Sequence, residues 1–282
     1  MQKLFNNILV PLRINRNTEA TIAKAVQFAN RMQTDLHLLC VLPYASGKIF
    51  RNRKGAESVE GKVFSLAQKK MEQLRFDFSK KLNDGLKLFL HLEFGEAEEV
   101  IAAYAGNEQI DLVYVAESRK RFSFGDNAPN ASRLARRINC PVLTLKSHPA
   151  LQGLKIIVMP VGPSLPVNKI RVAAYLAKKF NASIHLITRE RNGLLYEELA
   201  YMQKVLQLLR DNTDLCVTCK TMMGESLGDM AIQYANTVHA GLIVVGPGAE
   251  NSLPGVMNRL FSRFVFNESP VPVITVGDSV LA

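Results

Sequence analysis

Apolar runs of strand length alternate with longer amphipathic segments along the whole chain. A short apolar run that ends at a turn segment is typical of a buried strand, and strict alternation is typical of a half-buried one. In the first half, this pattern predicts strands at residues 8–12, 36–41, 86–93, 112–116 and 141–145.

The segments between these strands carry helical periodicity. Apolar residues from Ile22 to Ala29 recur at helical spacing after Asn17 and Thr18, which predicts a helix that one of these two side chains caps. A long helix is expected over about 58–82, and shorter helices over 96–105 and 130–138. The predicted apolar stripe of the long helix consists of Val63, Leu66, Met71, Leu74 and Phe78.

The second half repeats the plan of the first. Strands are predicted at residues 156–161, 184–187, 215–222, 242–245 and 273–276, with helices that start near Val167, Leu195, Leu227 and Val256. Ile-Leu-Val-Pro at 8–11 matches Ile-Val-Met-Pro at 157–160, and both halves close on a Pro-Val strand. The chain is therefore interpreted as a tandem duplication with domains at 1–147 and 153–282.

Strands that alternate with helices predict right-handed crossovers and parallel sheets covered on both faces. Each copy is thus expected to be an α/β, doubly wound, five-stranded parallel-sheet domain of Rossmann-like type. In such sheets, ligands bind beyond the carboxyl ends of the strands, where the strand order reverses.

Composition narrows the class of protein. Of the 282 residues, 48% are hydrophobic and 21% are charged, with a mean hydropathy of +0.03, which is typical of a soluble globular protein. No apolar run approaches the roughly 20 residues of a transmembrane helix, and Met1 to Asn7 do not resemble a signal peptide, so a cytoplasmic location is expected. The net charge is +10, and the first copy carries most of this basic surface.

Neither the cysteines nor the histidines form a recognisable catalytic or metal-binding set. Cys40, Cys140 and Cys216 lie in or beside apolar strands, where a thiol behaves as a small buried hydrophobe. Cys216 and Cys219 are three residues apart in a predicted strand and point to opposite faces. His37 and His185 occupy matching positions, which repeat ancestry and packing explain. No catalytic residue and no metal site is predicted, so the chain is not expected to be an enzyme.

The order of these signals resembles the universal stress protein family, over nearly the whole chain and in both copies. The resemblance rests on the opening Ile-Leu-Val-Pro pattern, on Gly95-Glu96 and Gly224-Glu225, and on the closing Pro141-Val142 and Pro272-Val273 pairs. It implies an α/β fold with strand order 3-2-1-4-5 in each copy. It also implies pairing through the closing strands, either in a homodimer or between the two copies of one chain.

ATP-binding members of that family carry an Asp after the first strand and a glycine-rich loop after the fourth. Here the Asp position is Arg13 in the first copy and Gly162 in the second, and no glycine follows the fourth strand of the first copy until Gly125. The second copy keeps Gly246, but it has Ala249 at the second glycine position. The first copy is therefore interpreted as a degenerate site, and standard ATP binding is expected to be impaired.

The second copy is the predicted ligand holder, for ATP or another adenine nucleotide. Val161 and Gly162 are expected to line the base or ribose side, because they follow the first strand of this copy. Glycines let backbone N–H groups approach a phosphate, and hydroxyl or amide groups add donors. The predicted phosphate-facing residues are Gly246, Gly248, Asn251 and Ser252.

The basic segments of the first copy support a weaker alternative, a nucleic-acid surface. Arg119-Lys120-Arg121 stands in place of the phosphate loop, and Arg136-Arg137 and the 48–54 loop add charge, but only Phe122 and Phe124 could stack on bases. Nucleic-acid binding is not expected.

Two further alternatives remain open: a ligand-free scaffold, and a nucleotide-hydrolysing enzyme on a related fold, although no pyrophosphate loop or acidic metal cluster supports the latter. The protein partner is not indicated.

Overall fold

The computed structural model describes residues 3–44, 53–116, 131–145, 151, 153–190, 195–224, 226–246 and 271–277. The chain divides into two compact units. One, the N-terminal unit, consists mainly of Phe5–Ala116, and the other, the C-terminal unit, mainly of Ala131–Ala282. The predicted boundary near residue 150 differs from this division, because the helix and strand over 131–145 cluster with the second unit.

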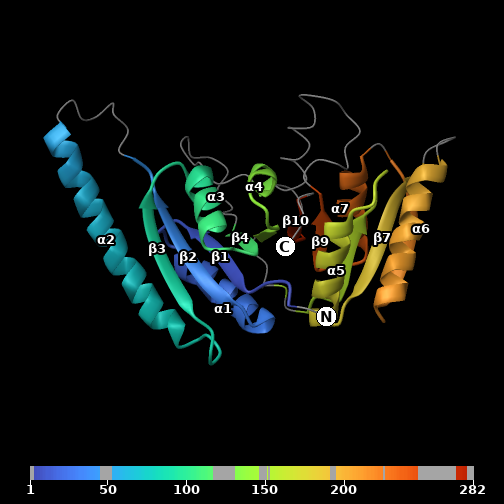
Figure 1. Ribbon diagram of the computed structural model, residues 1–282, viewed down its shortest axis with the longest axis horizontal. Coiled ribbons are helices and arrows are strands. Elements are labelled where there is room, and N and C mark those ends of the chain that lie inside the picture. Colours follow the sequence, from blue (N-terminus) through green and yellow to red (C-terminus); the bar gives the residue numbers. More distant parts are fainter. Residues whose placement is uncertain are drawn as a thin grey trace. The chain divides into compact units, whose positions relative to one another are not determined.

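The N-terminal unit alternates strands and helices, as its sequence pattern predicts (Figure 1). Its elements are β1 (Asn7–Leu12), α1 (Thr18–Met32), β2 (Asp35–Leu42), α2 (Arg53–Ser79), β3 (Leu88–Phe94), α3 (Ala97–Asn107) and β4 (Leu112–Ala116). The strands form a parallel sheet in the order β3-β2-β1-β4.

The C-terminal unit contains the last helix and strand of the first copy and the whole described part of the second. Its elements are α4 (Ala131–Arg137), β5 (Val142–Leu145), β6 (Ile156–Pro160), α5 (Val167–Phe180), β7 (Ser183–Glu190), α6 (Leu195–Asn212), β8 (Val217–Met223), α7 (Leu227–Thr237), β9 (Leu242–Val245) and β10 (Val273–Thr275). The helix predicted near Val256 lies outside the described residues.

The second copy has the predicted strand order. Its strands run β8-β7-β6-β9-β10, which is 3-2-1-4-5 within the copy, and all are parallel. The α/β class and the parallel, doubly wound sheet are thus confirmed. β10 also pairs antiparallel with β5, with Ile274 opposite Leu143, so the closing strands of the two copies meet inside one chain.

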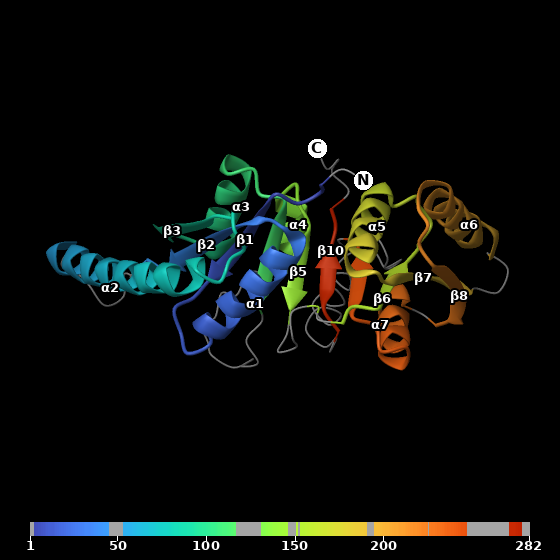
Figure 2. The same ribbon diagram turned by 90° about the horizontal axis from the view of Figure 1, so that it is seen from below.

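Helices cover both faces of each sheet. In the N-terminal unit, α1 and α2 lie on one face and α3 on the other (Figure 2). In the C-terminal unit, α5 and α6 share a face and α7 covers the opposite one, where Ala231 and Ala235 pack on Val158, Ile187 and Ile243 (Figure 2). Burial on both sides explains why the central strands read as continuous apolar runs.

Two local predictions are wrong. Asn17 precedes α1 but its side chain makes no capping hydrogen bond, because Thr18 and Asn15 bond within the preceding turn instead.

In α2, Met71, Leu74 and Phe78 are buried as predicted, whereas Val63 and Leu66 are 43% and 69% exposed. The two exposed residues lie N-terminal to the buried ones, so the predicted stripe is covered only from Ala67 onward. Within the described residues, no helix is long and apolar enough to cross a bilayer.

Candidate functional site

The carboxyl ends of β6 and β9 form the candidate site. β6 pairs with β7 along its whole length, from Ile156 to Pro160. Its pairing with β9 stops early, after Ile157–Leu242 and Val158–Ile243. The two strands therefore separate toward their carboxyl ends, at the point where the strand order reverses. This is where open α/β sheets bind ligands.

Val161 and Gly162 follow β6 directly, as the sequence predicts. The Val161 side chain is fully buried, its N–H donates to the Ile187 carbonyl at 2.8 Å, and its carbonyl accepts from the Thr188 hydroxyl at 3.0 Å. Gly162 is less crowded, because an added Cβ would meet only Leu227 Cδ2, at 4.0 Å. Val161 is thus firmly anchored to β7, while the neighbouring glycine leaves space for a larger group.

Gly246 follows β9 directly, so the structure places it and Gly162 just beyond the ends of neighbouring strands of the sheet. Gly246 is partly exposed. The other predicted phosphate-facing residues, Gly248, Asn251 and Ser252, lie outside the described residues. Ligand contact by all six predicted residues stays a prediction.

The structure adds a buried lysine that the sequence analysis missed. Lys169 lies in the first turn of α5 and is only 6% exposed, and its ammonium donates to the Pro160 carbonyl at 2.7 Å. A lone lysine within a helix is usually solvated. The one indication of burial in the sequence was its position within an apolar repeat of Val167, Ile170 and Ala174. Lys169 stands directly before Ile170, which is buried.

A buried ion pair lies at the end of the next strand. Arg189, near the end of β7, donates from Nη2 to Oε1 of Glu198 in α6 at 2.9 Å, with side-chain exposures of 8% and 14%. The other carboxylate oxygen of Glu198 is buried and has no hydrogen-bond partner in the described structure. Charged groups thus lie near the carboxyl ends of both β6 and β7: Lys169 at the Pro160 carbonyl and Arg189 within β7.

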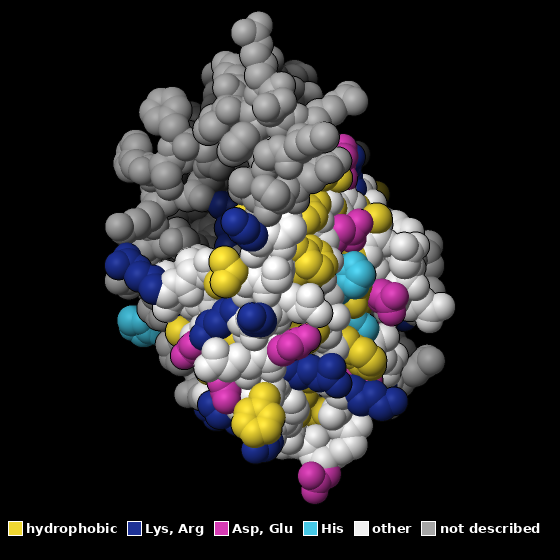
Figure 3. All heavy atoms as spheres, turned by 90° about the vertical axis from the view of Figure 1, so that its left-hand side faces the viewer, with side chains coloured by type: hydrophobic (Ala, Val, Ile, Leu, Met, Phe, Trp, Pro, Cys, Tyr) yellow, Lys and Arg dark blue, Asp and Glu magenta, His cyan; other side chains and the backbone are white. Residues whose placement is uncertain are grey.

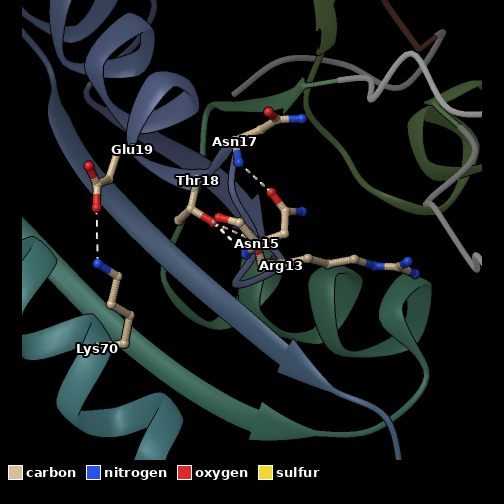
Figure 4. Close-up of polar contacts among 6 residues, drawn as sticks. All are labelled: Arg13, Asn15, Asn17, Thr18, Glu19 and Lys70. Atoms are coloured by element: carbon tan, nitrogen blue, oxygen red, sulfur yellow. Dashed lines mark hydrogen bonds and ion pairs between the residues drawn. The ribbon is translucent and has the colours of Figure 1, made fainter.

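The corresponding turn of the N-terminal unit uses its polar groups internally (Figure 4). The Thr18 hydroxyl lies 2.8 Å from the carbonyls of Arg13 and Asn15 and accepts from the Asn15 N–H at 2.8 Å. The Asn15 side chain accepts from the Asn17 N–H. The exposed side chain of Arg13 extends away from this cluster (Figure 4). The turn therefore presents a cation where ATP-binding relatives are expected to carry an Asp.

The basic surface can be followed only in part. Arg119-Lys120-Arg121, Phe122 and Phe124 lie outside the described residues. Arg136 and Arg137 form the last turn of α4, where cations favour the negative end of the helix dipole. On the face that shows α2 and β3, basic, acidic and hydrophobic side chains are interspersed (Figure 3). No single-sign stripe of the kind that follows a nucleic-acid backbone is visible on the described part of that face.

The matching histidines each have a tyrosine partner, which the sequence analysis did not anticipate. His37 Nδ1 lies 3.0 Å from the Tyr104 hydroxyl, and His185 Nδ1 lies 3.0 Å from the Tyr234 hydroxyl. Burial lowers the pKa of both histidines and raises that of Tyr104 to about 12. Each tyrosine is the eighth residue of its helix, Tyr104 in α3 and Tyr234 in α7. This matching position was the feature of the sequence that could have identified the two pairs. A histidine whose pKa is lowered by burial and that bonds to a phenol is typical of packing, and this holds for the buried His37 and the partly buried His185.

The four cysteines are free thiols, and their burial differs from the prediction at one position. Cys40 and Cys140 are buried, whereas Cys216 is exposed, in line with Thr218 and Lys220, which are the exposed alternate residues of the edge strand β8. Burial raises the pKa of Cys40 to about 11, so this thiol is unreactive at neutral pH. Across the described ranges, no three His, Cys, Asp or Glu side chains gather as metal ligands would.

Comparison with known proteins agrees with this fold. A doubly wound sheet with order 3-2-1-4-5 defines a nucleotide-binding-like α/β class. Within that class, the model of the Universal stress protein family matches residues 4–146, just over half of the chain. The chain belongs to this family. A search of curated proteins finds no match.

Solved structures resemble the whole chain at low identity. A universal stress protein from Archaeoglobus fulgidus is 16% identical, with 96% of each chain covered and a TM-score of 0.71. A putative universal stress protein from Pseudomonas aeruginosa is 17% identical, with 99% of this chain and 96% of that one covered and a TM-score of 0.60. The cytoplasmic domain of a prokaryotic cation chloride cotransporter also matches, with 13% identity, 98% and 96% coverage and a TM-score of 0.52. At these identities the likeness concerns the fold alone.

Proposed function

We propose that this universal stress protein is a non-enzymatic binding protein whose C-terminal unit holds a nucleotide-like ligand beyond β6 and β9. The observation that carries this proposal is the early end of the β6–β9 pairing at Val158, beside a β6–β7 pairing that continues to Pro160. In this proposal the ligand enters an opening beyond the ends of these strands, which Gly162 and Gly246 would flank.

The N-terminal unit acts in this proposal as a partner without a ligand. Its β1–α1 turn bonds to itself through Thr18 and Asn15, and the exposed Arg13 replaces the expected acid. The contribution of the first copy is structural: its last strand, β5, belongs to the C-terminal unit and pairs there with β10. A homodimer through other surfaces is compatible with this arrangement but is not part of the proposal.

A thermal-shift titration of the full chain with ATP, ADP, AMP and cyclic dinucleotides tests the proposal. A ligand that binds only the folded state raises its stability, by about 2.7 kcal/mol at 100 times the Kd. We expect a saturable shift with at least one nucleotide. The shift should disappear in Gly246→Val, which places a branched side chain at the opening. It should persist in Gly106→Ala, because a Cβ added at Gly106 has no neighbour within 4 Å.

Two results would contradict the proposal. No shift with any nucleotide would favour a ligand-free scaffold. Steady ATP turnover that is lost in Asn251→Ala would instead make the protein an enzyme, so phosphate release is measured on the same samples.

A further inference from the structure

The outer edge of β3 carries backbone groups that no strand of the described structure pairs. β3 is the last strand of its sheet and pairs with β2 alone among the described strands (Figure 1). The Lys87 carbonyl accepts from the Leu36 N–H, and the Gly95 N–H also bonds toward β2, so the odd-numbered residues face β2. Since backbone groups alternate in direction along a strand, those of the even-numbered residues point outward. These residues are Leu88, Leu90, Leu92 and Phe94.

The side chains of β3 do not block pairing at this edge. Phe89, His91 and Glu93 alternate along the face that carries α3, and all three are exposed. Nε2 of His91 lies 3.3 Å from Oε2 of Glu93. On the face toward α2, Leu90 and Leu92 remain partly exposed. The strand contains no lysine and no proline, the residues with which natural edge strands commonly oppose pairing.

The backbone of β3 fits a second molecule of this chain across a two-fold axis at His91, the central residue of the strand. In an antiparallel pair with this centre, Leu90 would lie opposite Leu92, and Leu88 opposite Phe94. These are the residues whose backbone groups point outward, so they would form the hydrogen-bonded pairs of the ladder. Each apolar side chain on the α2 face would then lie opposite another apolar side chain.

The exposed face of such a pair is also complementary in charge. The two His91 rings would face each other as a non-hydrogen-bonded pair, and Glu93 of each molecule would lie on the diagonal from His91 of the other. Each imidazole would thus have two carboxylates beside it. The same operation on β8, the outer strand of the second repeat, would place Lys220 against Lys220, because this exposed lysine is the central residue of β8. Like charges directly opposite each other oppose pairing.

We propose that two molecules of this protein form a symmetric dimer through antiparallel pairing of their β3 strands. The closing strands β5 and β10, through which the family resemblance implies dimerisation, already pair with each other within one chain. A two-fold interface uses the same surface on both molecules, so association through β3 stops at the dimer.

Sedimentation equilibrium of the full chain tests this dimer. Wild type should approach twice the chain mass of 31.4 kDa as its concentration rises to about 0.5 mM, which detects a submillimolar Kd. His91→Lys gives β3 the central lysine that β8 has, and it should raise the dimer Kd at least about tenfold. Thr218→Lys is the matched control, because it adds the same charge at an exposed position of β8; it should behave as wild type. Wild type that stays monomeric, or a dimer that persists unchanged in His91→Lys, overturns the proposal.

Disulfide trapping tests the register, and it decides the matter if His91→Lys does not fold. The variants carry Cys216→Ser, which removes the exposed native thiol. His91→Cys should form a disulfide-linked dimer on oxidation, because Cα atoms of a non-hydrogen-bonded pair lie about 4.5 Å apart, within disulfide range. Glu93→Cys should not, because its two thiols would be four residues apart along the strands, roughly 14 Å. Cross-linking at position 91 alone supports the proposal, and any other pattern overturns it.

Discussion

Nδ1 of His37 and the hydroxyl oxygen of Tyr104 lie 3.0 Å apart, between the middle of β2 and the third turn of α3. His37 is 4% exposed and stacks on Phe89, with 4.5 Å between ring centroids. Its other ring nitrogen is buried without a hydrogen-bond partner in the described structure. The imidazole therefore depends on Tyr104 for its polar contact, and this dependence can be measured.

Tyr104→Phe should lower the free energy of unfolding by about 1–3 kcal/mol, because it leaves a buried ring nitrogen without its partner. The corresponding change in the other repeat, Tyr234→Phe, should cost about 1 kcal/mol or less, because His185 is only partly buried and water can replace the phenol. Urea unfolding followed by circular dichroism measures both. Equal losses in the two variants would contradict the difference in burial.

Acid should weaken the contribution of His37 to stability. Burial lowers the pKa of His37, against the opposing effects of Glu108 and Asp35, whereas the unfolded chain keeps a value near 6.5. Below that pH the unfolded state binds the proton and the folded state does not, so this contribution is complete above about pH 6.5 and falls as the pH drops. The stability difference between wild type and His37→Asn should shrink from about pH 7.5 to about pH 5. A constant difference would refute this assignment.

Gly95→Ala should destabilise the fold more than Gly224→Ala, although the two glycines match in the repeats. A Cβ at Gly95 would lie 2.5 Å from Val100 Cγ2, on a short, stiff side chain, and overpacking of this kind costs about 1–3 kcal/mol. A Cβ at Gly224 would lie 2.8 Å from Met230 Sδ, which can move.

Val100→Ala supplies the internal control for this clash. Combined with Gly95→Ala in a double-mutant cycle, it should recover most of the lost stability, because it removes the methyl group in the way. Additive losses would show that something other than this contact opposes a side chain at position 95.

Two ion pairs with equal N–O distances should contribute differently to the free energy of unfolding, because one is buried and the other is exposed. Arg189–Glu198 and Lys70–Glu19 both measure 2.9 Å, but the first pair is 8% and 14% exposed and the second 34% and 65%. Glu198→Ala removes a buried, charge-assisted hydrogen bond to Arg189 and should cost about 1.5–3 kcal/mol. Glu19→Ala should cost about 0–1 kcal/mol. Thermal and urea unfolding measure both losses, and a Glu198→Ala loss as small as that of Glu19→Ala would contradict the buried character of the first pair.

The elements of the fold were largely accessible from the sequence, because strand and helix periodicity are local properties. The predicted starts of α5, α6 and α7 at Val167, Leu195 and Leu227 match the structure. Repetition of the pattern and the family resemblance then led to the strand order of the second copy. Predictions of burial failed where packing against another element decides it. Leu66 is an apolar residue of α2, but no described part of the chain covers it.

The chemistry of the candidate site depended on the tertiary structure. Periodicity identified Gly162 and Gly246 as residues that follow strands, but only the register shows that the pairing of β6 and β9 ends before them. His37 and Tyr104 are 67 positions apart, and no local pattern relates them. Lys169 reads as an ordinary helical lysine until folding brings its ammonium to the Pro160 carbonyl. Hydrophobic periodicity specifies which residues are buried together, whereas hydrogen bonds and charges act over a few ångströms between segments that only the packed fold brings into contact.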